Sequence, residues 1–520
     1  MPIVQQGTIN TTALVVPDLY VQIVPPQNLV MNGVPTNVIG MVGTASWGPV
    51  GQPVIIGTMA DYARNFGPVV ARKHDMGTQV ATAVQQGAQS FRCVRVSDGT
   101  DMAAQSALPG TTVIFTALYT GALGSRIALA LNPGSRTGSW RLTITLPGLT
   151  PEVFDNISGS GALFWSALAG SVNSGQGPQR GPSQLVTANG GGAVIAPTAV
   201  AITLGDGTAG SDGVAGVTDG HLLGADIVPR SGMYALRGQG CSIAALADTD
   251  NASYWSAQAA FGLAEGVYMI LTGPAGDSIA NAVAARQAAG LDSYSAKLMF
   301  GDFLWWSDQV SGIVRLVSPQ GFVAGRLGNL SPEQSSLNKP LYGVIGSQKS
   351  GTPGSGQATS YSSAELSVLL GGGIDVIVNP QPAGAFWGVR GGRNSSSNVA
   401  VNGDNYTRMT NYIAATLAAG MGQYVGQVIN LDLFRRIRAT QLSFLQNMLS
   451  QGLLGSSDGS LPFAVICDGS NNAPARTGMG YVQSDAQVKY QAINEKFIVN
   501  MEGGQTVQVS RQTLPSGQPS

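Results

Sequence analysis

The sequence is poor in charge. Only 11% of its 520 residues are Asp, Glu, Lys or Arg, whereas an ordinary soluble domain carries about 25%. The 27 basic and 28 acidic residues nearly cancel, and the formal net charge is -1. This balance argues against direct nucleic-acid binding, because phosphate contacts require a surplus of Lys and Arg. The 43% hydrophobic content also excludes a disordered, highly charged chain.

Histidines, paired cysteines and long apolar runs are scarce as well. The two histidines, His74 and His221, are too few to favour a histidine metal site. The three cysteines form no C-x-x-C pair, so neither a disulfide framework nor a zinc site is predicted, and a reducing compartment is favoured. The most apolar run, residues 111–131, is interrupted by glycines and Arg126, which argues against membrane insertion. The first residues show no secretory signal pattern.

Three enzyme motifs can be tested directly. Gly205, Gly207 and Gly210 fit G-x-G-x-x-G, but more glycines follow where a dinucleotide site needs a helix, so we expect a glycine-rich turn. Ser457 stands in a G-x-S-x-G, but a predicted helix precedes it and no histidine follows it, as a hydrolase would need. No G-K-[ST] occurs. We therefore predict no catalytic, metal or cofactor-binding residues, no cofactor, and no enzymatic activity.

What the sequence has in abundance is glycine, with 71 residues, together with ample apolar material. The first 60 residues carry one charged side chain, Asp18. A free monomer exposing such a segment would be prone to aggregate. Two interpretations remain open, a glycine-rich globule and a subunit whose surface is buried in a large assembly. We favour the second.

The patterns divide the chain into five parts. Residues 1–30 form an N-terminal extended arm, in which residues 18–24 alternate like a strand between prolines. Residues 31–99 open a core α/β domain, with strands near 38–42 and 53–58, a helix opened by a capping box at Thr58 and Asp61, a helix over 77–89 and a strand after it. Residues 100–204 read as an inserted mostly-β domain with one helix near 161–170.

Residues 205–495 return to the α/β pattern as the main domain. We expect a helix over 253–266, strands near 267–271 and 296–303, a helix starting at Asp277, and two strands joined by a turn at 381–384. Two amphipathic helices, near 406–424 and 433–448, precede a strand at 463–468. Residues 496–520 form a C-terminal arm with strand-like alternation. The predicted fold class is α/β (α+β mixed), in several domains.

Six segments resemble, in the same order, the tail sheath protein of contractile-tailed bacteriophages, a family that includes bacteriocin and injection-system sheaths. They are residues 16–26, 38–68, 204–224, 317–346, 371–390 and 461–499. The second contains a G-x-A-x-x-G-P turn, and the last an Asp followed by Asn-Asn. One departure stands out, since Gln320 occupies a place where the family more often has a small residue. Residues 100–204 depart most from a shared pattern.

The resemblance implies a mechanical role. Subunits would polymerise as stacked hexameric rings around a tail tube, and contraction without nucleotide hydrolysis would drive the tube through the host envelope. The implied partners are further copies of this chain, the tail tube protein, and the baseplate and tail terminator proteins. The implied location is the virion tail, assembled in the host bacterial cytoplasm.

The resemblance also assigns roles to two sets of residues. The arms would add strands to a sheet of neighbouring subunits, through Leu19, Tyr20, Val21, Ile23, Phe497, Val499, Met501, Val507 and Val509. A C-terminal-domain helix would face the tube, with Arg435, Arg436 and Arg438 as candidates. Three alternatives stay open. The arms could fold back on their own subunit, the arginines could form a solvated helix face, and the protein could instead be a virion surface or receptor-binding protein that uses the inserted domain.

Overall fold

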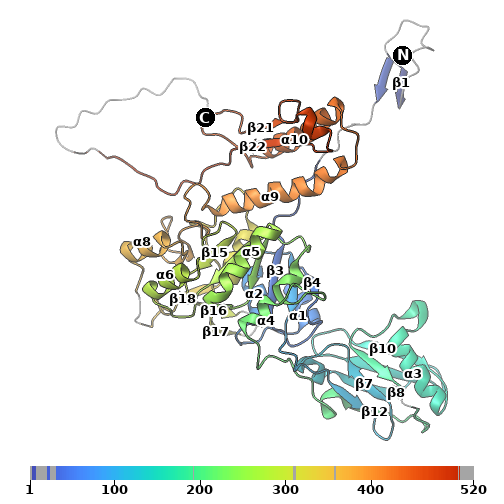
Figure 1. Cartoon of the computed structure of the whole chain (residues 1–520). Helices are drawn as coiled ribbons and strands as arrows, with labels where there is room; N and C mark the ends of the chain where they lie inside the picture. The colour runs from blue at the N-terminus through green and yellow to red at the C-terminus, as the bar shows by residue number, and fades with distance from the viewer. Residues whose placement is uncertain are drawn as a thin grey trace.

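The computed structural model describes residues 31–190, 192–308, 312–355, 359–501 and 503, together with the backbone of residues 3–6 and 20–23. The molecule is elongated, with a core body between an inserted lobe at one end and a C-terminal lobe at the other (Figure 1). Helices and several separate sheets occur together, which confirms the mixed α/β class. None of the described helices is long and apolar enough to span a membrane.

The core body is built on a six-stranded sheet in the order β15-β14-β13-β3-β5-β4. Its strands are β3 (Ile39–Gly43), β4 (Pro53–Ile56), β5 (Phe91–Arg95), β13 (Ile243–Leu246), β14 (Tyr268–Thr272) and β15 (Ala296–Met299). All neighbours are parallel except β4, which runs antiparallel to β5 at one edge. The parallel strands are buried on both faces, as their continuous apolar runs predict.

Helices cover both faces of this sheet. One face packs against α1 (Met59–Phe66), α2 (Met76–Gln85) and α7 (Gln320–Asn329). The other packs against α4 (Asp219–Leu223), α5 (Trp255–Glu265), α6 (Ile279–Ala288) and α8 (Ser363–Gly371). The predicted capping box of α1 is confirmed, with Thr58 and Asp61 bonding each other's backbone. The expected start of α6 is off by one residue, because Ser278 rather than Asp277 caps it.

Glycines let α7 lie directly against α2. A Cβ built on Gly325 would stand 2.4 Å from the Cα of Ala83, and one on Gly321 would stand 2.5 Å from the carbonyl oxygen of Gln79. Real Cβ atoms do not approach other atoms this closely, so a side chain at either position would force the helices apart.

We therefore expect Gly325→Ala to lower the free energy of unfolding by about 1–3 kcal/mol, the usual cost of overpacking. Gly371→Ala in α8 is the matched control, because a Cβ there meets nothing within 4 Å. That variant should be neutral or stabilising by up to about 1 kcal/mol, since glycine weakens a helix. Urea unfolding of the two variants measures the difference. Equal stabilities would show that the α2–α7 contact tolerates a methyl group.

Two small antiparallel sheets complete the core body. One is β17-β16-β18, from β16 (Leu304–Asp308), β17 (Ile313–Val317) and β18 (Val344–Ser347). The other pairs β19 (Ile377–Val378) with β20 (Gly388–Val389). The predicted strand pair around residues 381–384 is confirmed, although each strand has only two residues.

The inserted lobe, residues 100–213, has its own hydrophobic core. The lobe contains a four-stranded sheet in the order β10-β9-β8-β12, a three-stranded sheet in the order β11-β7-β6, and helix α3 (Ala162–Ser174). The strands are β6 (Gln105–Ala107), β7 (Ile114–Ala117), β8 (Ala128–Pro133), β9 (Trp140–Thr145), β10 (Glu152–Ile157), β11 (Val186–Asn189) and β12 (Val200–Thr203). The inserted lobe extends past residue 204, the end expected from the sequence, because Thr208 and Ser211 still form β-bridges with Gln105 and Met102.

The C-terminal lobe, residues 404–490, also has separate apolar clusters. It contains α9 (Asp404–Met421), α10 (Leu431–Ser450), β21 (Phe463–Ile466), the short α11 (Pro474–Thr477) and β22 (Asp485–Val488). The two long helices are confirmed. The sequence analysis put residues 205–495 in one domain. In the structure this stretch contributes to the core body and builds the C-terminal lobe.

The three glycines of the apparent dinucleotide motif lie in a close-packed turn, as the sequence analysis expected. A 3-10 turn, Leu204–Asp206, follows β12 where the motif would need a long helix. A Cβ on Gly207 would stand 2.3 Å from the carbonyl oxygen of Gln105, and one on Gly210 would stand 2.2 Å from that of Gly121. Glycine is required here by contact with the inserted lobe's own backbone.

Candidate assembly surfaces

The N-terminal arm carries two strands rather than one. The predicted strand is present as β2 (Tyr20–Ile23), which holds three of the candidate arm residues. A strand that the sequence analysis missed, β1 (Ile3–Gln6), pairs with it in parallel. Among the described residues neither strand has another partner, and the pair stands apart from the core body (Figure 1). Leu19 lies outside the described residues.

The C-terminal arm departs from the expected strand pattern. Residues 489–501 form no strand or helix within this chain. Its apolar side chains are solvent-exposed, with Phe497 at 82%, Val499 at 71% and Met501 at 88%. Val507 and Val509 lie outside the described residues. A run of exposed apolar side chains that lies outside the helices and strands of the described residues has the properties expected of a segment that pairs with another chain.

The three candidate tube-facing arginines lie on α10 but differ in their contacts. Arg436 pairs with Asp432 one turn earlier, at 3.1 Å. The Nε of Arg438 donates to the carbonyl of Val465 in β21, at 3.1 Å, so it ties the helix to its own sheet. Arg435 is exposed and has no ion-pair or hydrogen-bond partner among the described residues. Of the three, Arg435 has the guanidinium that is free to meet a partner.

A buried ionic cluster fastens the C-terminal lobe to the core body. Lys297 of β15 pairs with Asp375 at 2.7 Å and with Asp404, the first residue of α9, at 3.0 Å. The hydroxyl of Tyr268 in β14 donates to Asp404 at 2.6 Å, and the amide of Ser336 donates at 3.1 Å. Burial alone would raise the pKa of Asp404, but Lys297 and these donors lower it overall. No local sequence pattern indicates this cluster, because its members are far apart along the chain.

A second cluster of buried polar side chains lies near the carboxyl ends of the parallel strands. Strand order reverses between β3 and β13, the position where open α/β sheets commonly bind ligands. Here the fully buried amide of Gln320 donates to the carbonyls of Leu246 and Ile270, at 3.0 and 2.9 Å, and accepts from the amide of Asp248. The imidazole of His74 bonds the carbonyl of Ala247 at 2.8 Å. The departure at Gln320 thus has a structural role, since this side chain joins the last residue of β13 to the middle of β14.

Asp75, next to His74, gives a testable pH dependence. Burial raises its pKa from 3.8 to about 6, although Thr78 and Arg72 act in the opposite direction. A raised pKa means that folding favours the protonated acid. This contribution to stability is complete below pH 3.8 and is lost as pH rises through about 6.

Asp75→Asn keeps an acceptor oxygen for the amide of Thr78 but does not titrate. We therefore expect the stability of the wild type relative to this variant to fall by about 2 kcal/mol between pH 4 and pH 7.5. Urea unfolding at the two pH values measures the change. Parallel pH profiles of the two proteins would contradict the assignment.

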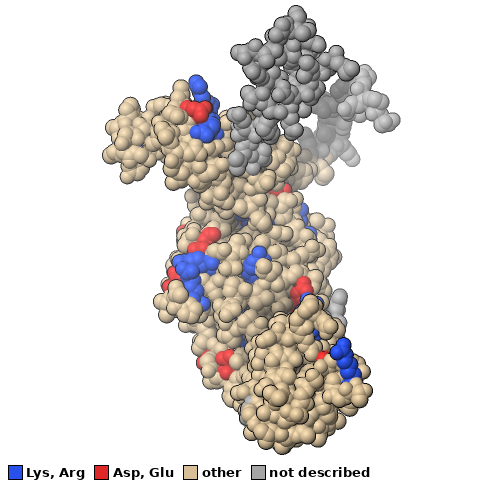
Figure 2. Space-filling view, turned by 90° about the vertical axis from the view of Figure 1, so that its right-hand side faces the viewer, with Lys and Arg blue, Asp and Glu red and all other residues tan. Residues whose placement is uncertain are grey.

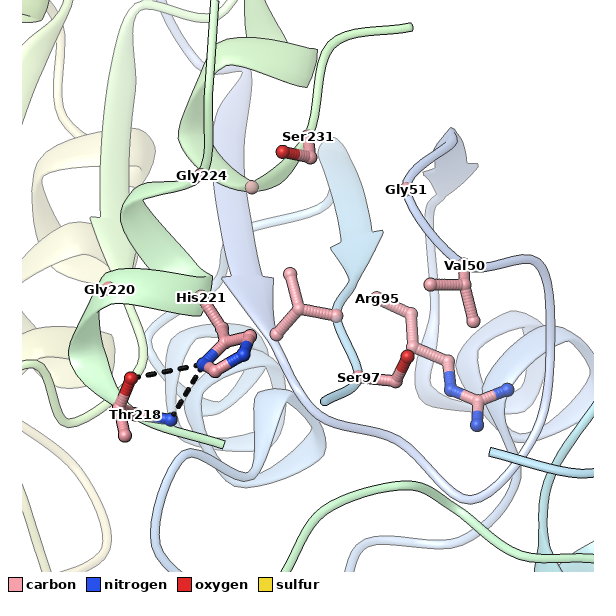
Figure 3. Close-up of a pocket in the computed structure, with 11 residues that line it drawn as sticks. Val50, Gly51, Arg95, Ser97, Thr218, Gly220, His221, Gly224 and Ser231 are labelled. Atoms are coloured by element: carbon pink, nitrogen blue, oxygen red, sulfur yellow. Dashed lines mark hydrogen bonds between the residues drawn. The ribbon is translucent and has the colours of Figure 1, made fainter. Parts of the chain in front are cut away.

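A hollow of about 420 Å³ lies between β5 and the segment that carries α4 (Figure 3). Its polar side chains are engaged locally. The Nδ1 of His221 contacts the hydroxyl and amide of Thr218, and the hydroxyl of Ser231 accepts from the amide of Ala225. The guanidinium of Arg95 points away from His221 and donates to the carbonyls of Gly48 and Thr120 (Figure 3). The hollow therefore presents no serine–histidine pair arranged for nucleophilic catalysis.

Charged side chains are sparse on the molecular surface. Figure 2 shows them as isolated groups on the face turned to the viewer, where the inserted lobe is almost wholly uncharged. Such a surface contains few ions that would have to be desolvated when another protein covers it. The distribution agrees with the composition and favours burial of broad surfaces in an assembly.

Comparisons with known proteins give different results for the sequence and for the fold. At the level of sequence, no family model and no curated protein matches the chain. Solved structures do match. A sheath tail protein from Listeria innocua aligns with a TM-score of 0.58 at 15% identity, covering 84% of this chain and 89% of that one.

Two sheaths in the contracted state are similar over nearly the whole chain. The PVC sheath of an extracellular contractile injection system has a TM-score of 0.55 at 12% identity, covering 95% of this chain and 98% of that one. The helical sheath of the anti-feeding prophage has a TM-score of 0.54 at 12% identity, covering 94% and 99%. The architecture, including both lobes and the core body, is therefore the fold of contractile tail sheath proteins.

Proposed function

We propose that this chain is the structural subunit of a contractile tail sheath. Copies stack as hexameric rings around a tail tube, and the lattice shortens without nucleotide hydrolysis to drive the tube through a bacterial envelope. The observation that carries this proposal is the similarity of fold over 95% of the chain to a sheath in its contracted state. The sparsely charged surface supports it, as does the strand pair β1-β2, which has no other partner among the described residues.

The arms supply the links between subunits in this proposal. An isolated two-stranded sheet is marginally stable in water. Among the described residues, β1-β2 of the N-terminal arm is such a sheet, and β21-β22 of the C-terminal lobe also has only two strands, although it packs on α10. We infer that β21-β22 of one subunit accepts strands from the arms of its neighbours, so that several incomplete sheets become one larger sheet.

The strength of such a link follows from backbone pairing. An arm that forms about five hydrogen bonds, each worth a net ~0.5–1.5 kcal/mol, contributes roughly 3–8 kcal/mol. Burial of exposed side chains such as Phe497 and Met501 adds to this. A connection of this size persists while weaker contacts between core bodies break and re-form.

Electron microscopy of the purified protein tests the proposal directly. We expect hollow helical polymers with six subunits per ring, and shortened particles when the sheath is assembled on its tube. Polymerisation should proceed unchanged when nucleotides are removed. Monomers that bind a cell surface through the inserted lobe would instead support a receptor-binding protein. Nucleotide hydrolysis abolished by a point substitution in this chain would overturn the proposed mechanism.

Arg435 provides a test of tube attachment. We propose that it pairs with an acidic group of the tube, a contact worth about 0–1 kcal/mol per exposed pair and therefore easily broken in every subunit. Arg435→Glu should reduce the fraction of extended sheath on tubes while tube-free polymer forms normally. Arg436→Glu, whose partner lies on its own helix, is the matched control. Equal loss of both polymers with Arg435→Glu would indicate a folding role.

A further inference from the structure

A short segment, residues 31–37, connects the N-terminal arm to the central strand β3 and lies along α9. We call this segment the strap. Met31 is buried, Val34 and Thr36 are half-buried, the other four residues are exposed, and the strap forms no regular secondary structure. Met31 is buried among the apolar side chains of the C-terminal lobe, including Met409 and Phe444. The amide of Val34 donates to the hydroxyl of Thr416 at 3.2 Å.

Apart from the buried side chain of Met31, the strap is held by fewer hydrogen bonds than the sheet that it joins. Its remaining bond to α9 is a long one, 3.4 Å from Arg408 to the carbonyl of Thr36. Hollows of about 500 and 230 Å³ flank it, and Val34, Pro35 and Thr36 line both. β3, in contrast, pairs with strands on both sides along its length. A pull on the arm would therefore release the strap before it disturbed the sheet.

The buried cation that the strap covers retains partners when the strap leaves. Arg408 is buried, and burial lowers its pKa to about 10, so a bare guanidinium here would be costly. It also donates to the carbonyls of Leu330 and Ser331, each at 2.8 Å. Those bonds do not involve the strap. Release therefore exposes no unpaired buried cation, and the strap can return to the same place.

We propose that residues 31–37 are a peelable strap that lengthens the N-terminal arm when sheath subunits move relative to one another. The inference rests on the proposed function. While the strap is seated, the arm leaves the subunit at Met31 on α9. Once it has peeled, the arm leaves at Val38, and Met31 can lie anywhere within about 24 Å of it, the reach of seven extended residues. The link between neighbours then survives a change of spacing without breaking its strand pairing.

A disulfide that locks the strap tests the proposal in assembled sheath. Val34→Cys with Thr416→Cys places thiols on the two residues that the backbone-to-hydroxyl hydrogen bond joins, and Cys241→Ser removes the native cysteine that lines the neighbouring hollow. We expect the oxidised protein to form extended sheath and then to fail to contract, or to break its rings, whereas the reduced protein contracts. Normal contraction of the oxidised sheath would overturn the strap alone. Failure of the wild-type chain to form sheath would overturn the proposed function, and the strap with it.

Hydrogen exchange on the unassembled chain tests the same point without a lattice. The amide of Val34 should exchange at least about tenfold faster than the amides of β3, because the strap opens locally while the sheet opens only on unfolding. The disulfide should abolish that difference. Thr416→Val, which removes the acceptor of the Val34 amide, should increase it. Exchange of the Val34 amide at the rate of β3 in the wild type would show that the strap belongs to the rigid core.

Discussion

Replacing Lys297 by methionine is expected to lower the free energy of unfolding by about 3–5 kcal/mol, the usual cost of removing one partner from a buried ion pair. Lys297 and Asp404 have fully buried side chains, and Asp375 is nearly so. Without the ammonium group, two carboxylates remain close together in the protein interior. The loss of stability should appear in urea unfolding of the whole chain, and the C-terminal lobe, which begins with α9, should unfold first.

The matched control is Lys489→Met. Lys489 lies 3.9 Å from Asp458, and both side chains are more than half exposed. Exposed pairs contribute about 0–1 kcal/mol, so this variant should stay close to the wild type. A second variant, Lys297→Met with Asp404→Asn, removes one of the stranded charges and should recover part of the stability. Equal stability of Lys297→Met and Lys489→Met would contradict the assigned role of the cluster.

Removing residues 1–24 is expected to abolish sheath formation and leave a folded monomer. The deletion takes away β1 and β2, whose described contacts are with each other, and it spares the strap and β3. Loss of a link worth roughly 3–8 kcal/mol lowers the association constant by at least about a hundredfold. Circular dichroism and sedimentation measure folding and assembly separately.

Replacing the same 24 residues by a Gly/Ser segment of equal length is the control for chain length. It should fail to assemble in the same way, because it restores the covalent length without the strand-forming side chains. Normal polymers from either protein would show that the N-terminal arm is not the connector. An unfolded monomer would show that the arm folds back on its own subunit, the alternative that the sequence analysis left open.

The sequence predicted the elements whose signals are local. The alternation in β2, the capping box at Thr58 and the helical periodicities of α9 and α10 each depend on neighbours a few residues away. Six ordered segments were enough to indicate the sheath fold, although no family model and no curated protein matches the sequence. β1 escaped because its sequence, IVQQ, lacks the alternation of apolar residues that indicated β2. The C-terminal lobe was not recognised as separate because its division depends on which apolar faces meet.

The polar clusters could not be predicted from the sequence for a related reason. Lys297 and Asp404 are 107 positions apart, and neither has local neighbours that indicate burial. The three arginines near residue 436 formed a group by proximity in sequence, but each has a different environment on α10. Gln320 was noticed only as a departure from a family pattern, and its contacts with β13 and β14 explain why a long amide is suitable there.

The way in which the inserted lobe joins the core body has a consequence for engineering. The chain leaves and re-enters at adjacent points, since the amide of Asp98 bonds the carbonyl of Gly213 at 2.8 Å. The two ends of the inserted segment therefore stay adjacent whatever its length, and the entropic cost of closing it as a loop grows only slowly with that length. Another domain with adjacent termini could be grafted between these two residues, provided that it also covers Trp47 and accepts a hydrogen bond from Arg95, as this lobe does. The lobe is in this sense a cargo position, at which a sheath could display a foreign protein once per subunit.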